Sequence, residues 1–171
     1  MYLGTEMQAL DELEEFDYFI GVGHNGIRRK VYNALFDRLG NPINAIHPSA
    51  VVSASVEMKY GTMISANATI NPLVTLGTGV ICNTSSSIDH ECVVDDFAHI
   101  GPGAVLCGNV KVGANTFVGA NAVVKQGVTI GQNVTIGAGT VVIRDIPDNV
   151  MVVGNPQRVL VKEEVQKLAA A

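Results

Sequence analysis

The sequence has 171 residues, of which 47% are hydrophobic and only 5% aromatic, and its formal net charge is −5. This length and composition fit one soluble domain with at most a small appendage. The negative charge and the lack of a basic cluster argue against a nucleic-acid partner. No signal peptide and no apolar run of about eighteen residues is recognisable, so we expect neither secretion nor a membrane span.

The amino-terminal part, residues 1–45, reads as a small α/β segment after an acidic start. Residues 16–23 are predicted to form a short buried strand that enters a glycine loop at Gly23, with His24 in the turn. Residues 27–39 have the apolar spacing of a helix. The outer face of that helix is expected to carry Arg28, Arg29 and Lys30. Such a unit can bind an anion at the helix start, or simply cap the next segment by packing.

The middle of the chain repeats with a strict period of six. Every sixth residue from Ile46 to Val142 is apolar, and the residues four positions further on are small or β-branched. Each unit is therefore predicted to be one short strand and one turn, with the bulky aliphatic residue pointing inward. One unit cannot bury its apolar face alone, so the units must stack as a solenoid.

This repeat resembles the hexapeptide-repeat acyltransferases, and residues 112–117 and 130–135 show the unit most plainly. The resemblance implies a mainly β fold, a left-handed parallel β-helix with three hexapeptides per coil. Seventeen units then make between five and six coils, roughly 25–28 Å tall at a strand spacing of about 4.8 Å.

A polar, titratable cluster interrupts the repeat between Asn83 and Cys92. In the six-residue frame His90 occupies a corner between two acidic residues, so its ring should project outward. Residues 18 apart lie one coil above another, which predicts that Gly108 lies directly over His90. A glycine there leaves room for a reacting carbonyl, and its amide could stabilise an oxyanion, often worth about 3 kcal/mol.

The stretch from Asn83 to Cys92 is similar to the catalytic segment of one branch, the sialic-acid O-acetyltransferases and nucleotide-amino-sugar N-acetyltransferases. The resemblance implies that His90 is the general base, because an acceptor amine or hydroxyl must lose a proton as it attacks the thioester of acetyl-CoA. It also implies that an acidic neighbour orients the ring. We expect that neighbour to be Glu91, with Asp89 as the alternative orienting residue or as a substrate ligand. Asn83 is a further substrate candidate, or a structural ladder residue.

Relatives in this family bind coenzyme A along a corner groove, at positions that match His99, Ala120 and Ala138. The resemblance implies that His99 bonds the thioester or the pantetheine arm. Small residues at corners are also what the fold itself requires. The sequence of Gly154, Asn155, Pro156 and Arg158 looks like the closing motif of the family, where the backbone passes near coenzyme A.

The order of the segments also matches that branch, in which a Rossmann-like amino-terminal domain holds a UDP-sugar. The resemblance covers about residues 16–160 and makes Gly23 a substrate-binding candidate. Family members begin with an earlier strand and a glycine- and histidine-rich phosphate loop, so we expect a partial sugar-nucleotide segment over 1–45. The β-helix is expected over 46–147 and a carboxyl-terminal extension over 148–171. A short helix is predicted from 162, and residues 167–171 are either its end or a vector-derived tail.

We therefore expect a cytoplasmic, homotrimeric acetyltransferase that uses acetyl-CoA, with N-acetylation of a UDP-4-amino-sugar favoured. The alternatives are O-acetylation of sialic acid or another sugar, and a non-catalytic β-helix scaffold. No metal is expected, since only His90 and His99 are suitably placed in the coils for a zinc site of the carbonic-anhydrase kind. Cys82, Cys92 and Cys107 are interpreted as reduced thiols in or beside the core.

Overall fold

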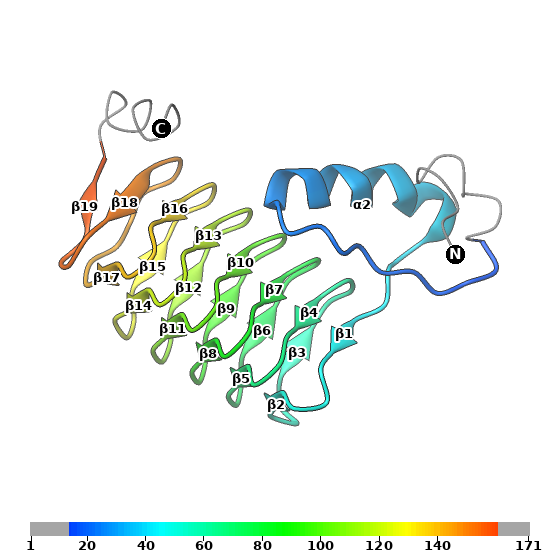
Figure 1. Cartoon of the computed structure of the whole chain (residues 1–171), viewed down its shortest axis with the longest axis horizontal. Coiled ribbons are helices and arrows are strands. Elements are labelled where there is room, and N and C mark those ends of the chain that lie inside the picture. The colour runs from blue at the N-terminus through cyan, green and yellow to red at the C-terminus, as the bar shows by residue number, and fades with distance from the viewer. Residues whose placement is uncertain (1–13, 161–171) are drawn as a thin grey trace.

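The computed structural model describes residues 14–160 and shows a β-solenoid of about six turns preceded by one helix (Figure 1). Seventeen two-residue strands, β1 to β17, follow one another with a turn after each. Each strand from β1 to β14 pairs in parallel with the strand 18 residues further along, as Ala45 pairs with Met63 and His99 with Phe117. This register confirms that three six-residue units make one coil.

The strands form three sheets, one on each side of a triangular prism. The eight-stranded sheet contains, in order, β1 (Ala45–Ile46), β4 (Met63–Ile64), β7 (Ile81–Cys82), β10 (His99–Ile100), β13 (Phe117–Val118), β16 (Thr135–Ile136), β18 (Met151–Val153) and β19 (Arg158–Val159). The six-stranded sheet contains β17 (Val141–Val142), β14 (Val123–Val124), β11 (Val105–Leu106), β8 (Ser87–Ile88), β5 (Thr69–Ile70) and β2 (Val51–Val52). The five-stranded sheet contains β15 (Thr129–Ile130), β12 (Lys111–Val112), β9 (Val93–Val94), β6 (Thr75–Leu76) and β3 (Glu57–Met58).

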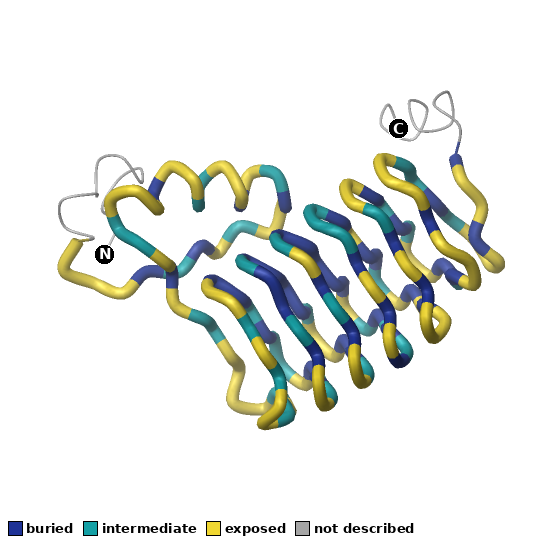
Figure 2. Tube along the Cα trace, turned by 180° about the vertical axis from the view of Figure 1, so that it is seen from behind, coloured by how far each residue is buried: buried dark blue, intermediate teal, exposed yellow. Residues whose placement is uncertain are grey.

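The core runs down the middle of the prism. The positions of the apolar series from Ile64 to Val142 are all buried, and the first coil, with Ile46, is more exposed because no earlier coil covers it. Figure 2 shows buried residues along the strands and exposed ones at many of the turns. The predicted inward series is thus confirmed, with Cys82 as a buried member, and Cys92 is buried in the second series, four positions further on.

The corners explain why asparagine and glycine recur between the strands. Six of the asparagines at corners have positive φ angles, a conformation that asparagine and glycine tolerate better than other residues. These residues are Asn67, Asn109, Asn115, Asn121, Asn133 and Asn149. Four residues of other types adopt the same conformation: Leu73, Ser85, Glu91 and Phe97, with φ angles of 63°, 56°, 59° and 57°.

The helix α2 (Asn25–Leu39), the only helix among residues 14–160, begins after His24 and ends at Gly40, whose φ angle is 72°. The predicted helix is therefore confirmed, two residues longer at its start. The predicted strand over 16–23 is wrong: the segment is extended but not paired in a sheet. No strand of residues 14–160 pairs with it, and Tyr18 accepts a backbone hydrogen bond from Ile43. Tyr18, Ile20 and Leu35 instead form a small apolar cluster.

Residues 14–45 accordingly form no Rossmann-like sheet, and the predicted helix from 162 lies outside the described residues. The helix α2 packs along the corner between the five-stranded and eight-stranded sheets, where Phe97 is buried and contacts Tyr32 edge to face. Arg28 was expected on the outer face of α2, but it is buried, with 1% of its surface exposed. In the part of the chain that is described, no helix is long and apolar enough to cross a bilayer.

Candidate active site

His90 lies at the corner between the six-stranded and five-stranded sheets, directly after β8. Its side chain is exposed, as predicted, and its Nδ1 lies 3.0 Å from Oε2 of Glu91. A carboxylate only accepts hydrogen bonds, so Nδ1 carries the hydrogen and Nε2 keeps its lone pair. The left-handed backbone of Glu91 is a local strain of the kind that collects at functional sites.

Asp89 uses its carboxylate differently. Its Oδ1 accepts hydrogen bonds from the backbone N–H of His90 at 2.8 Å and from Nδ2 of Asn71 at 2.9 Å. The hydrogen bond from the His90 backbone, helped by Asn71, lowers the pKa of the Asp89 carboxyl. Asp89 therefore stabilises the turn that carries His90, whereas Glu91 contacts the ring.

Gly108 lies over the imidazole, as the 18-residue rule predicted. A Cβ atom on Gly108 would lie 2.6 Å from both Cε1 and Nε2 of His90, closer than any side chain permits. The next residue, Asn109, donates its backbone N–H to the carbonyl of His90 at 2.8 Å. Only glycine at this position leaves the face of the ring next to Nε2 open to a substrate.

A second group surrounds His99, in β10 of the eight-stranded sheet. Its Nδ1 lies 3.3 Å from the carbonyl of Gly23, and its Nε2 lies 3.1 Å from Nδ2 of Asn83. Phe117 contacts the ring edge to face, with 5.1 Å between ring centroids. Burial is the main cause that lowers the pKa of His99. The structure thus brings together three predicted ligand-binding residues, His99, Asn83 and Gly23.

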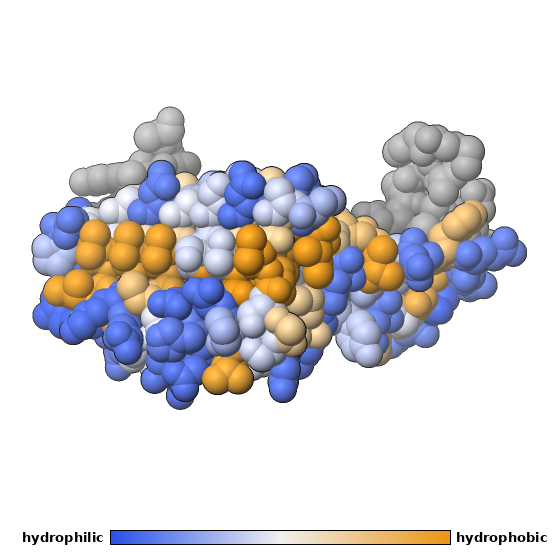
Figure 3. Space-filling model, turned by 90° about the horizontal axis from the view of Figure 1, so that it is seen from below, coloured by the Kyte–Doolittle hydropathy of each residue, from blue (hydrophilic) through white to orange (hydrophobic). Residues whose placement is uncertain are grey.

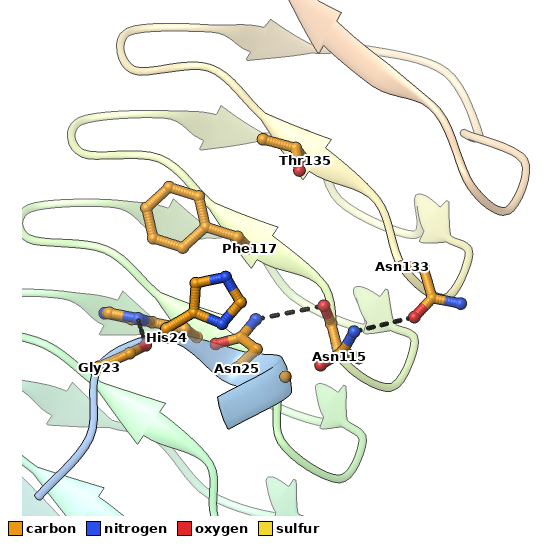
Figure 4. Close-up of a pocket in the computed structure, with 9 residues that line it drawn as sticks. Gly23, His24, Asn25, Asn115, Phe117, Asn133 and Thr135 are labelled. Carbon is orange, nitrogen blue, oxygen red and sulfur yellow. Dashed lines mark hydrogen bonds between the residues drawn. The ribbon is translucent and has the colours of Figure 1, made fainter. Parts of the chain in front are cut away.

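A cavity of about 450 Å³ opens beside this group, at the start of α2 (Figure 4). It is lined by Gly23, His24, Asn25, Gly26, His99, Asn115, Phe117, Asn133 and Thr135. His24 accepts a hydrogen bond from the backbone of Ile27 and so caps the helix. Asn115 donates to Asn133, and its own buried Oδ1 has no hydrogen-bond partner among the described residues. One lining residue of the cavity therefore carries a buried acceptor that the described residues leave unsatisfied.

The two groups occupy different sides of the prism within one chain. Ala120 and Ala138 lie at the corner between the eight-stranded and six-stranded sheets, beside the His99 group. His90 lies at the opposite edge of the six-stranded sheet. One protomer therefore does not bring its predicted base to its own predicted coenzyme A positions.

Two contributors were missed by reasoning from the sequence. Asn71 supports Asp89, and its position 18 residues earlier was a usable signal. Arg28 donates a hydrogen bond to the carbonyl of Gly23 in the His99 group, but it lies in a basic run whose pattern predicts a solvent-exposed surface. Among residues 14–160, no group of three or more His, Cys, Asp or Glu side chains is placed to hold a metal ion.

Six-residue repeats wound into a β-solenoid, with an acid-paired histidine at one corner, define a hexapeptide transferase. Residues 91–126 match the family described as bacterial transferase hexapeptide (six repeats). Residues 109–144 match the hexapeptide repeat of succinyl-transferase.

Three similar proteins place the chain more closely. The acetyltransferase domain of PglB from Neisseria gonorrhoeae, solved with acetyl coenzyme A, is 40% identical with a TM-score of 0.86, covering 88% of this chain and 75% of that one. PerB from Caulobacter crescentus, solved with CoA and GDP-perosamine, is 40% identical with a TM-score of 0.87, and the match covers 90% of this chain and 75% of PerB. GDP-perosamine N-acetyltransferase of Escherichia coli O157:H7 is 33% identical over 138 residues, 80% of this chain and 54% of that protein.

The chain therefore belongs to the hexapeptide-repeat acetyltransferases and is similar to enzymes that act on sugar nucleotides. It spans about half the length of the curated relative from E. coli.

Proposed function

We propose that this protein transfers the acetyl group of acetyl-CoA to the amine of a nucleotide-linked amino sugar. The observation that carries the proposal is the His90–Glu91 pair, 3.0 Å apart, beneath the open face left by Gly108. The relatives add the substrate class, because the PglB domain was solved with acetyl coenzyme A and PerB with CoA and GDP-perosamine. The solenoid is expected to be left-handed, as in the family.

The chemistry follows from the arrangement around the ring. Nε2 of His90 takes a proton from the acceptor nitrogen as that nitrogen attacks the thioester carbonyl. Glu91 holds the hydrogen on Nδ1 and stabilises the imidazolium that forms. Within the described residues the N–H of Gly108 makes no hydrogen bond, so it is available to the oxyanion. Collapse of the tetrahedral intermediate forms the amide, breaks the C–S bond and expels CoA as its thiolate. The thiolate then takes the proton from His90.

A complete site on this scheme needs a second copy of the chain. His90 and the alanine corner lie at opposite edges of the six-stranded sheet, so a cyclic assembly through that sheet joins the base of one copy to the groove of the next. The outward positions at the upper end of this sheet are Val105, Val123 and Val141, and Val123 is 38% exposed. Figure 3 shows a band of hydrophobic side chains running along the solenoid, flanked by polar ones. These features support a homotrimer built around the valine face.

The sugar nucleotide is placed at the start of α2. Gly23 and the helix start line the 450 Å³ cavity, which gives a ligand access to the amino end of the helix. Asn83 borders the same group through His99. Both UDP- and GDP-linked amino sugars are candidates, because the cavity alone does not select a base.

The test measures acetyl-CoA binding by calorimetry and then follows free thiol with UDP-4-amino-sugars and GDP-perosamine as acceptors. The wild type should bind acetyl-CoA and release thiol, and His90→Ala should bind acetyl-CoA but lose about 10²–10⁴ in rate. His47→Ala is the matched control, since His47 bonds Ser49 at the first coil, outside the site. A product ester in place of an amide would redirect the proposal to O-acetylation. A lack of acetyl-CoA binding would favour the scaffold.

A further inference from the structure

Arg28 makes an unusual set of contacts for a buried cation. Its Nε donates to the carbonyl of Gly79 at 2.8 Å, and its Nη1 donates to the carbonyls of Val22 at 3.0 Å and Gly23 at 2.9 Å. Its Nη2 donates to the carbonyl of Phe97 at 2.8 Å, and contacts Oδ1 of Asn25 at 3.0 Å and the carbonyl of Ala98 at 3.4 Å. In the part of the chain that the structure describes, no carboxylate contacts Arg28.

These contacts join two segments that are far apart in the sequence. Val22 and Gly23 belong to the loop before α2, whereas Gly79, Phe97 and Ala98 belong to the solenoid, and Ala98 directly precedes His99. Arg28 therefore fixes the loop against the strand that carries His99. Burying a charge that is bonded only to carbonyl oxygens costs free energy. We therefore expect the benefit of burying Arg28 to be the fixed position of the loop against the solenoid.

The carbonyl of Gly23 is the link to His99. It accepts from Nη1 of Arg28 and also lies 3.3 Å from Nδ1 of His99. A carbonyl can only accept, so Nδ1 of His99 must carry a hydrogen. Figure 4 shows the dashed contact that ends on Gly23 beside the cavity.

The opposite side of the ring gives the same assignment independently. Oδ1 of Asn83 accepts the backbone N–H of Thr84 at 2.8 Å, which fixes the orientation of the amide. Nδ2 of Asn83, 3.1 Å from Nε2 of His99, must then be the donor. His99 is therefore neutral, with its hydrogen on Nδ1 and its lone pair on Nε2.

We propose that Arg28 is a positioning residue for acetyl transfer: through the carbonyl of Gly23 it holds His99 as a neutral ring whose Nε2, which accepts from Nδ2 of Asn83 in this structure, accepts an N–H of the ligand in its place. This role rests on the proposed function only in naming acetyl-CoA as the ligand. A ring in this form cannot donate to the thioester oxygen from Nε2. Its partner is an N–H donor, and the pantetheine arm of acetyl-CoA carries two amides of that kind.

The first experiment observes the tautomer directly by ¹⁵N NMR of the full-length protein labelled at histidine. His99 is assigned by comparison with His99→Gln. In the wild type near neutral pH we expect a protonated Nδ1 and an unprotonated Nε2 at His99. In Arg28→Gln we expect this signal to change to a mixture of tautomers, and in Arg29→Gln, the neighbouring exposed arginine, we expect it to stay as in the wild type.

The second experiment measures KM for acetyl-CoA and kcat in the same variants. Arg28→Gln should raise KM about tenfold and change kcat by less than about threefold, which corresponds to loss of one good hydrogen bond. Arg28→Lys keeps the charge but not the forked donors, so it should resemble Arg28→Gln.

The two readouts separate the ways in which the inference can fail. A protonated Nε2 or a charged ring at His99 in the wild type would overturn it, whatever the variants do. An unchanged His99 signal and unchanged KM in folded Arg28→Gln would also overturn it. If the expected tautomer is observed but acetyl-CoA does not bind the wild type, the positioning of His99 stands and the proposed function fails.

Discussion

Nδ1 of His90 and Oε2 of Glu91 lie 3.0 Å apart, although the two side chains are 47% and 58% exposed. An exposed pair of this kind contributes little to stability, typically up to about 1 kcal/mol. The contact orients the ring and favours the hydrogen on Nδ1. We therefore expect the pair to matter for activity rather than for folding.

Glu91→Gln should reduce kcat strongly and leave the melting temperature nearly unchanged. The amide of glutamine can donate to Nδ1, which would move the ring hydrogen to Nε2 and remove the base. We expect a loss within the range of about 10²–10⁴ that general-base catalysis supplies. Thiol release measured beside a thermal melt checks this, and full activity in Glu91→Gln would show that Asp89 or another group orients His90.

Glu91→Asn should stabilise the protein while it removes the hydrogen bond between His90 and Glu91. Glu91 has a φ angle of 59°, and asparagine adopts this conformation at lower cost. We expect the free energy of unfolding to rise by about 0.5–1 kcal/mol, measured by urea denaturation. Leu73→Asn is the matched control, because Leu73 lies one coil below with a φ angle of 63°. It should be stabilised similarly and keep its activity.

Gly108→Ala should impair catalysis by displacing the imidazole. The added Cβ would lie 2.6 Å from Nε2 of His90, and the exposed ring can move away, so folding should be affected by less than about 1 kcal/mol. We expect kcat to fall at least tenfold. The same change in the His90→Ala background should cause a smaller further loss if the effect passes through the ring. Equal losses in both backgrounds would assign the effect to the Gly108 amide.

Ala138→Glu should weaken acetyl-CoA binding without unfolding the protein. Ala138 is exposed at its corner, where a longer, negatively charged side chain would fill the groove and repel the phosphates of the cofactor. A rise of at least tenfold in the Kd measured by calorimetry is expected. Ala66→Glu, in the same corner column three coils below Ala120, should bind acetyl-CoA as the wild type does.

Stability should fall as the pH rises above about 8.5, because of the buried thiols. Burial raises the pKa of Cys82 to about 12 and that of Cys92 to about 11, whereas an unfolded thiol ionises near 8.5. Between these values the unfolded chain binds fewer protons than the folded one, so alkali favours unfolding. Urea denaturation from pH 7 to pH 10 should show a shallower decline for Cys82→Ala than for the wild type. Identical slopes would contradict this assignment.

Residue spacing predicts the relative positions of many site residues, but it does not predict which acidic neighbour contacts the ring of His90. The 18-residue repeat was enough to place Gly108 over His90 and to group Ala120 with Ala138. Whether Asp89 or Glu91 contacts the ring was not decided by spacing, because both flank the histidine. The left-handed backbone at residue 91 and the hydrogen bonds of Asp89 to the turn decide it in favour of Glu91.

The amino-terminal segment shows where sequence patterns cannot suffice. Alternating apolar residues over 16–23 look like a strand, but a strand needs a neighbour to pair with, and no strand within residues 14–160 is adjacent. Arg28 and Arg29 look equivalent in a basic run. Which of them is buried depends on how α2 lies against Phe97 and the solenoid.

The sequence by itself determined the solenoid and its corner histidine, because units with a six-residue apolar period can bury their apolar faces only by stacking, and the family resemblance supplied the coil length. Only the tertiary structure decided the burial of Arg28, the tautomer of His99 and the separation of His90 from the corner that carries Ala120 and Ala138. Such properties depend on contacts between segments far apart in the sequence, such as that of Arg28 with Gly79, 51 residues away. A sequence pattern does not specify how α2 packs against the solenoid.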